Sequence, residues 1–234
     1  MFLPNSTLLT IDATMGGWEL FKNSLLPMIM GGIQYTIPLT LIAFTIGLAL
    51  ALLLAIMRLS KTPIVRAPSV AIVSAVRGTP LLVQLFIVFY GLPSLGLTID
   101  PFPSAVIAFS INVGAYASEI IRASILSISK GQWEAAYTIG MTQNTALRRI
   151  IIPQAARVSV PPLSNTFISL VKDTSLASLI LVTELFRKAQ EIAAVTYDFM
   201  LIYIEAALLY WVVCFLLSLV QQAIESRLER HISA

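Results

Sequence analysis

The sequence predicts an all-α protein that crosses a membrane about five times. Hydrophobic residues make up 57% of the 234 residues and charged residues only 12%, whereas soluble domains carry about 25% charged residues. The apolar residues are gathered in long uncharged runs, without the two-residue polar alternation of a transmembrane β-strand. Composition and pattern together therefore indicate a helical, multi-pass membrane protein.

The uncharged runs are long enough to form membrane-spanning helices, because a bilayer core of about 30 Å needs roughly 20 helical residues. No charged residue occurs in the runs 23–57, 78–99, 101–118 and 206–224, and only Lys172 and Asp173 interrupt the run 158–183. We therefore expect a membrane domain at 30–225, with spans near 30–57, 68–92, 103–125, 157–182 and 198–225. An N-terminal segment, 1–29, and a C-terminal tail, 226–234, flank this domain.

The segment before the first span mixes apolar and charged side chains. In the stretch GGWELFKNSLLPMIMGG, residues 16–32, the apolar Trp18 and Phe21 stand next to Glu19 and Lys22. Such a mixture is typical of a helix that lies in the membrane interface. A loosely ordered leader is an equal alternative.

Lys and Arg residues set the expected orientation, because cytoplasmic loops of membrane proteins are enriched in them. Of the 15 Lys and Arg residues, eleven fall on one side of the predicted spans: Arg58, Lys61, Arg66, Arg77, Arg122, Lys130, Arg148, Arg149, Arg157, Arg227 and Arg230. Only Lys22, Arg187 and Lys188 fall on the other side. We therefore expect the first side to be cytoplasmic, with the N-terminus outside the cell and the C-terminus inside.

The largest cytoplasmic loop, residues 129–153, is expected between the third and fourth spans, and its first half has the signals of a short helix. Ser129 and Gln132 have the spacing of a capping box, which would place Glu134 in the first turn, near the positive end of the helix dipole. Gly140 is expected to end this helix, since glycine is the commonest residue just beyond a helix C-terminus.

The second half of the loop has the signals of another short helix. Thr142 is a suitable N-cap, and Arg148 and Arg149 would lie in the last turn, where cations are favourable. Pro153 is expected to end the helix because its ring removes a backbone donor. From these signals alone, the loop is equally compatible with a plain surface linker.

The spacing within this loop resembles the EAA motif of ABC importer permeases. The matching positions are Glu134, Ala135 and Ala136, then Gly140 after three residues, and after nine more Ile150, Ile152 and Pro153. Ile152 stands where this family more often has Leu. The stretches RGTPLLVQLFIVFYGLP (77–93), GAYASEIIRASILSISKGQWEAA (114–136), IIPQAARVSVPPLSNTFISLVKDTSLAS (151–178) and VTELFRKAQEIA (182–193) are similar to the polar amino acid branch, and within it to the L-cystine permeases of bacteria.

The resemblance implies a type I permease fold in which the loop is a coupling helix that docks on a cytoplasmic ATPase. It also implies a second permease chain, identical or homologous, two ATPase subunits that carry ATP and Mg²⁺, and an extracellular solute-binding protein. Such an assembly works in the bacterial plasma membrane by alternating access. The substrate is then L-cystine or another polar amino acid.

The chain itself is expected to bind no cofactor and to catalyse no reaction. The phosphate-binding pattern G-x4-G-K-[ST] does not occur in it, so ATP hydrolysis would have to take place on another chain. Its single histidine, His231, lies in the tail. Neither a Ser/His/Asp triad nor a multi-histidine metal site is therefore expected.

Lys172 and Asp173 fall near the middle of the predicted fourth span, where a charge costs about 2.5–3.5 kcal/mol on insertion scales. An amino acid offers a carboxylate and an ammonium group, which would suit this pair, with the polar Asn165, Thr174 and Ser175 near it in a substrate passage. An equal alternative is a structural network in which Asp173 bonds to Arg77 or Lys172 bonds to Glu119.

The other polar residues of the spans are weaker candidates for the passage. Glu119 is three residues before Arg122, so an ion pair along one helix is the favoured role. Arg77 is an interfacial anchor, to which the resemblance adds a possible role in an inner gate, and Gln84 and Tyr90 would face a passage from the second span. The carboxylates expected near the outer face, where a partner would dock, are Glu184, Glu191, Asp198 and Glu205.

Two other functions remain open. A secondary transporter driven by an ion gradient would account for Lys172, Asp173 and Glu119, but it would leave the loop 129–153 unexplained, and no internal repeat of the kind common in such folds is evident. A membrane scaffold that transports nothing is the other alternative.

Overall fold

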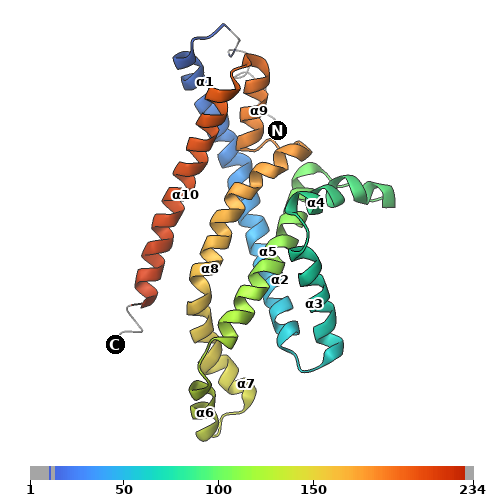
Figure 1. Ribbon diagram of the computed structural model, residues 1–234, viewed down its shortest axis with the longest axis vertical. Coiled ribbons are helices and arrows are strands. Elements are labelled where there is room, and N and C mark those ends of the chain that lie inside the picture. The colour runs from blue at the N-terminus through green and yellow to red at the C-terminus, as the bar shows by residue number, and fades with distance from the viewer. Residues whose placement is uncertain (1–10, 12–13, 230–234) are drawn as a thin grey trace. The chain divides into compact units, whose positions relative to one another are not determined.

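The computed structural model describes residue 11 and residues 14–229, and every regular element in this range is a helix (Figure 1). Three helical stretches in this range are long and apolar enough to cross a membrane: Gly17–Leu59, α5 (Pro101–Leu126) and Phe199–Leu228 of α10 (Phe199–Glu229). Two bent helix pairs raise the number of spans to five if each pair crosses once. The all-α, multi-pass prediction is confirmed. Arg230, His231 and the end of the predicted tail lie outside the described residues.

The first span and the segment before it form one continuous helical stretch. Helix α1 (Gly17–Gly31) passes into a π-helical turn, η2 (Gly32–Thr36), and then into α2 (Ile37–Leu59). Trp18 and Phe21 stack with their ring centroids 5.7 Å apart, and Lys22 lies over the Trp18 ring. No break separates the expected interfacial helix from the span, because the wider π-helical turn joins the two α-helices without interrupting the helical path.

The predicted second span, 68–92, is not one straight helix. Helix α3 (Pro63–Arg77) ends at Gly78, and the chain bends by 105° before α4 (Leu81–Phe86), the π-helical turn η3 (Ile87–Gly91) and the 3₁₀ helix η4 (Leu92–Leu95). Pro80 explains the bend, since a proline disfavours helical geometry at the residue before it. The uncharged run alone gave no sign of this break.

The loop 129–153 and the predicted fourth span contain several short elements. Helix α6 (Lys130–Thr138) is followed by α7 (Gln143–Ala146), the π-helical turn η5 (Leu147–Ile151), α8 (Ile152–Asp173), the 3₁₀ helix η6 (Thr174–Ile180) and α9 (Leu185–Thr196). The prediction that Pro153 ends a helix is wrong, because Pro153 is the second residue of α8 and follows the wider turn of η5 by two positions. Lys172 and Asp173 lie at the end of α8 rather than in the middle of a helix.

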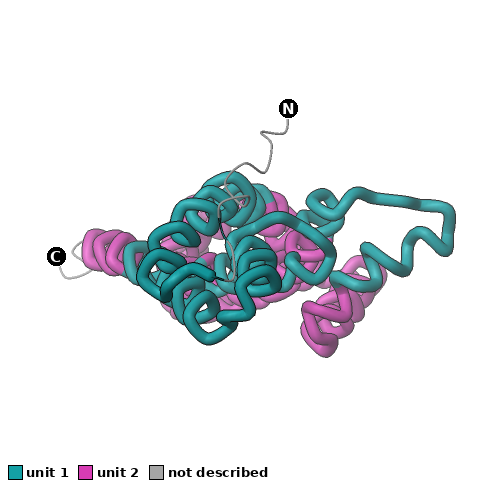
Figure 2. Tube along the Cα trace, turned by 90° about the horizontal axis from the view of Figure 1, so that it is seen from above, with its two compact units in different colours: residues 1–42, 85–107, 168–218 teal, residues 43–84, 108–167, 219–234 magenta. Residues whose placement is uncertain are grey.

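The chain divides into two compact units (Figure 2), and each unit has its own core. Unit 1 comprises residues 1–42, 85–107 and 168–218, and unit 2 comprises residues 43–84, 108–167 and 219–234. In unit 1, α1 packs against α9 around buried side chains such as Leu20, Met28, Leu185, Ile192 and Ile202. In unit 2, buried Leu54, Val73 and Ala115 form the core with Leu50 and Val76 packed against them.

Candidate functional site

The loop 129–153, which lies wholly in unit 2, is a folded elbow with well-defined helix ends. Gly140 has a φ of 80°, the left-handed conformation that favours glycine. Its N–H donates to the Tyr137 carbonyl oxygen at 2.9 Å, and the Met141 N–H donates to the Ala136 carbonyl oxygen at 3.0 Å. These two bonds form a Schellman motif, so the prediction that Gly140 ends the first helix is confirmed.

The start of the second helix is also as predicted, and the start of the first is not. Thr142 caps α7 by accepting a hydrogen bond from the Thr145 N–H at 3.3 Å. Ser129 is the N-cap of α6 but its side chain makes no capping bond. Gln132 does not complete a capping box, because its side chain accepts a hydrogen bond from Gln154 Nε2 at 3.0 Å instead. Glu134 is the fifth residue of α6, beyond the first turn.

The elbow has a buried inner side and an exposed outer side. Helix α6 packs against α7 and η5, and Ala136, Ala146 and Ile151 are buried there, at no more than 3% exposure. Tyr137 and Ile139 are exposed, Ile139 to 72%. Of the remaining predicted coupling residues, Glu134, Ala135, Gly140, Ile152 and Pro153 are exposed and Ile150 is half-buried. The elbow therefore presents a partly apolar surface.

The structure groups some of the predicted passage residues around a pocket in unit 1. A cavity of about 260 Å³ is lined by Lys172 and Ser175, by Phe186 of α9, and by Tyr203, Ala206, Ala207 and Tyr210 of α10. Lys172 is exposed, and the Ser175 hydroxyl donates to the Lys172 carbonyl oxygen at 2.7 Å. The aromatic residues of this pocket were not among the predicted passage residues, although the seven-residue spacing of Tyr203 and Tyr210 puts them on one face of α10.

The other passage candidates of unit 1 lie differently. Asp173 is half-buried, and Thr174 is fully buried with its hydroxyl donating to the Val171 carbonyl oxygen. Tyr90 is 58% exposed and packs edge-on against Phe86 and Phe89. Of these three residues, only Asp173 has a carboxyl group, and it directly follows the pocket residue Lys172 in the sequence.

A buried carboxylate, Glu184, organises the start of α9. Its two oxygens accept hydrogen bonds from the Phe186 N–H at 2.8 Å and the Arg187 N–H at 2.7 Å, which makes it the N-cap of the helix. The Tyr210 hydroxyl donates to it at 2.7 Å, and Thr36 lies at 3.5 Å. Glu184 is fully buried, so the prediction that it faces a docking partner is wrong, because hydroxyl groups distant in the sequence satisfy it.

The other carboxylates expected near the outer face are also engaged within unit 1. Glu205 is only 1% exposed and accepts a hydrogen bond from the Ser24 hydroxyl at 2.6 Å, so it too is not a docking residue. Glu191 pairs with Arg187 and Lys188 on α9. Asp198 accepts a hydrogen bond from the Leu201 N–H at the start of α10.

Three arginines converge on Glu119 in unit 2. Glu119 Oε1 pairs with Arg122, while Oε2 pairs with Arg58 and, at 3.5 Å, with Arg77 Nη1. The predicted pair with Arg122 is confirmed, and Arg58 at the end of α2 and Arg77 at the end of α3 are additional partners. We call these four residues the arginine cluster.

Gln84 holds the bend between α3 and α4. Its side-chain amide donates to the carbonyl oxygens of Val76 at 2.7 Å and Thr79 at 3.0 Å, and its oxygen accepts from Asn112 at 3.1 Å. Both ends of the amide are therefore bonded within unit 2. This structural role differs from the predicted contact with a passage.

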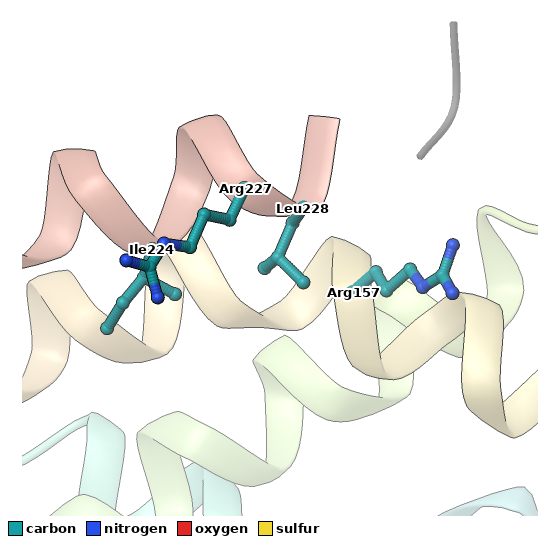
Figure 3. Close-up of a pocket in the computed structure, with 4 residues that line it drawn as sticks. All are labelled: Arg157, Ile224, Arg227 and Leu228. Atoms are coloured by element: carbon teal, nitrogen blue, oxygen red, sulfur yellow. The ribbon is translucent and has the colours of Figure 1, made fainter. Parts of the chain in front are cut away.

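The last passage candidate, Asn165, links α8 to α10 in unit 2 by accepting a hydrogen bond from Gln221 Nε2 at 3.1 Å. A groove of about 470 Å³ in the same unit is lined by Arg157, Ile224, Arg227 and Leu228. Figure 3 shows Leu228 extending from α10 toward α8, with Arg157 on α8 pointing away from it. Among the described residues, no three His, Cys, Asp or Glu side chains gather as metal ligands would.

Comparison with known proteins assigns the chain to a family. The family described as binding-protein-dependent transport system inner membrane component matches residues 47–230. The L-cystine transport system permease protein TcyB of Bacillus subtilis is 63% identical over 234 residues, 100% of each chain. The arginine transport system permease protein ArtQ of the same organism is 36% identical over 209 residues, 87% of this chain and 94% of the relative.

A solved structure described as an amino acid ABC transporter with histidines is 37% identical and matches with a TM-score of 0.86, covering 92% of this chain and 99% of the other. The family match alone spans most of the chain, and the similarity to TcyB extends over its full length. The chain therefore belongs to the family of inner membrane components of binding-protein-dependent transport systems, the permease subunits of ABC importers, in which separate subunits hydrolyse ATP.

Proposed function

We propose that this permease imports a polar amino acid, L-cystine, into the cytoplasm. The observation that carries the proposal is the 63% identity over the whole chain to a permease named for L-cystine transport. The relative named for arginine transport is only 36% identical, so the substrate differs between relatives at that distance. The higher identity to TcyB, over the full length of both chains, favours L-cystine as the substrate of this permease.

The elbow is the part through which ATP-driven movement enters the chain. The residues that carry this role are Glu134, Ala135, Ala136, Gly140, Ile150, Ile152 and Pro153. Two features support it: the Schellman motif at Gly140 gives α6 a fixed end, and exposed Tyr137 and Ile139 offer apolar contact area. A rigid, partly apolar projection suits a protein partner, since aromatic and aliphatic anchors dominate binding at such surfaces.

The pocket in unit 1 is the best-supported place for the substrate. Lys172 supplies a cation for a carboxylate, the Ser175 and Tyr203 hydroxyls supply further polar contacts, and Phe186 supplies an apolar wall. Small-molecule sites commonly combine an apolar lining with a few convergent polar groups. Its volume, about 260 Å³, suits part of a small amino acid substrate.

The assembly contains a second permease chain, identical or homologous, two ATPase subunits that carry ATP and Mg²⁺, and an extracellular solute-binding protein. The positive-inside distribution of Lys and Arg supports an elbow in the cytoplasm, an N-terminus outside and a C-terminus inside. ATP binding draws the ATPases together, the elbows move with them, and the passage opens toward the binding protein.

The test is ATP-dependent uptake of labelled L-cystine by the complex in proteoliposomes. Gly140→Ala forces a left-handed conformation on a residue with a Cβ, at a cost of about 1–2 kcal/mol, although no atom lies within 4 Å of the added Cβ. We expect this variant and Glu134→Ala to insert normally, to lose most uptake and to bind the ATPases less tightly.

The matched control is Gly131→Ala, on the same helix, where an added Cβ meets only Ser129 Oγ, at 4.0 Å. This variant should keep normal uptake because alanine favours a helix. Full uptake by both Glu134→Ala and Gly140→Ala would argue against the coupling role. Uptake that survives ATP depletion but collapses with the proton gradient would favour a secondary transporter instead.

A further inference from the structure

The arginine cluster carries more positive charge than its carboxylate balances. Within the described part of the chain, every ion pair of Arg58, Arg77 and Arg122 ends on Glu119, which leaves two positive charges unmatched. The side chains of Arg58 and Arg122 are only 14% and 29% exposed, so water solvates them in part. Unmatched charge in such a half-buried place is unfavourable.

The cluster also has unused hydrogen-bond donors. Each guanidinium group has five N–H donors, whereas Glu119 offers only two acceptor oxygens. Nε of Arg58 is buried and has no hydrogen-bond partner. The guanidinium carbon of Arg77 lies 5.4 Å from the centroid of the Tyr116 ring, and its side chain is 42% exposed. Stacking on Tyr116 thus orients Arg77 while leaving its donors accessible.

We propose that the arginine cluster is a binding site for an oxyanion of the phosphate or carboxylate type. Guanidinium groups recognise such anions through paired, charge-assisted hydrogen bonds. One singly charged oxyanion beside Glu119 would occupy spare donors and match one of the two remaining charges. The exposed Arg77 makes the first contact, and Arg58 and Arg122 complete the site from two other helices.

Two sources supply this chemistry. The cluster lies where α2 and α3 end, on the side whose Lys and Arg content predicts the cytoplasmic face, and phospholipid headgroups provide phosphate there. The second source is the carboxylate of an amino acid leaving the passage. This second source rests on the proposed function, whereas the anion site itself does not.

The experiment measures thermal unfolding of the full chain in a phosphate-free, uncharged detergent. Added ligands are phosphatidylglycerol, sodium phosphate against sodium chloride at equal ionic strength, and L-cystine, with a neutral glycolipid as the lipid control. A ligand at a hundredfold excess over its Kd should raise the unfolding midpoint by about 5–10 °C. Arg77→Gln should lose most of this rise, and Arg66→Gln, an exposed arginine of the same helix outside the cluster, should keep it.

Glu119→Gln gives a second readout that does not depend on Arg77. Removing the competing carboxylate should increase the rise caused by the anion, whereas a purely structural ion-pair cluster would lose stability that no anion restores. A rise with phosphatidylglycerol alone assigns the site to lipid, and a rise with phosphate or L-cystine assigns it to soluble anions. Equal responses in wild type, Arg77→Gln and Arg66→Gln, or no response to any anion, would overturn the proposal.

Discussion

The close approach of α2 and α5 in unit 2 gives the sharpest prediction about stability. An added Cβ at Gly47 would lie 2.7 Å from both Cβ and Cγ1 of Val113 and 3.0 Å from the Ser110 carbonyl oxygen. One turn further along, the Cβ of an alanine at Gly114 would lie 2.8 Å from Leu50 Cδ2. Apolar carbon atoms prefer about 3.5–4.0 Å, so Gly47→Ala must push the two helices apart.

The magnitude follows from two opposing effects. Overpacking a well-packed core costs about 1–3 kcal/mol, whereas alanine is more favourable than glycine in a helix by about 0.8–1.0 kcal/mol. Gly91→Ala isolates the second effect, because its Cβ would meet only Ile87 Cγ2 at an ordinary 3.7 Å. The difference between the two variants should therefore be about 1–3 kcal/mol in the free energy of unfolding.

Thermal unfolding of the purified protein in detergent, followed by tryptophan fluorescence, measures this difference. At about 2–4 °C per kcal/mol for a chain of this size, Gly47→Ala should unfold roughly 2–12 °C below Gly91→Ala. Identical midpoints would refute the reasoning, since they would mean that α2 and α5 do not approach closely at Gly47.

Two further predictions concern buried polar groups. Tyr210→Phe removes a donor from buried Glu184, and it should lower the free energy of unfolding by about 1.5–3 kcal/mol in a denaturation assay, whereas Tyr203→Phe, at a partly exposed ring of the same pocket, should change it by much less. Gln84→Leu leaves the carbonyl oxygens at the α3–α4 bend without their side-chain donor. Limited proteolysis should then cleave the bend faster in this variant than in the control Gln222→Leu, at an exposed position. Equal cleavage rates in the two variants would contradict the role of Gln84 in holding the bend.

Local signals predicted the features whose causes are local. The left-handed Gly140, the Thr142 cap and the Glu119–Arg122 pair all depend on residues at most five positions apart. Such short-range relations can be seen directly in the spacing of residues along the sequence. The uncharged runs likewise predicted a helical membrane protein, because bilayer thickness alone sets the length of a span.

Contacts between distant segments account for the errors. Gln132 has the spacing of a capping box, but Gln154, 22 residues away, takes its side chain. The carboxylates Glu184 and Glu205 were expected at the surface, whereas hydroxyl groups of Tyr210 and Ser24 hold them inside unit 1. No sequence pattern identifies the hydrogen-bond partner of a hydroxyl group in an apolar helix, so the burial of Glu184 and Glu205 could not be predicted.

The π-helical turns Gly32–Thr36, Ile87–Gly91 and Leu147–Ile151 bear on how relatives should be aligned. Such a turn holds one residue more than an α-helical turn. Deleting one residue there therefore converts the turn to an α-helix, and the side chains after it keep the directions in which they point. A deletion within α2 would instead rotate all later side chains of that helix by about 100°. Single-residue gaps between homologues therefore belong at these three turns.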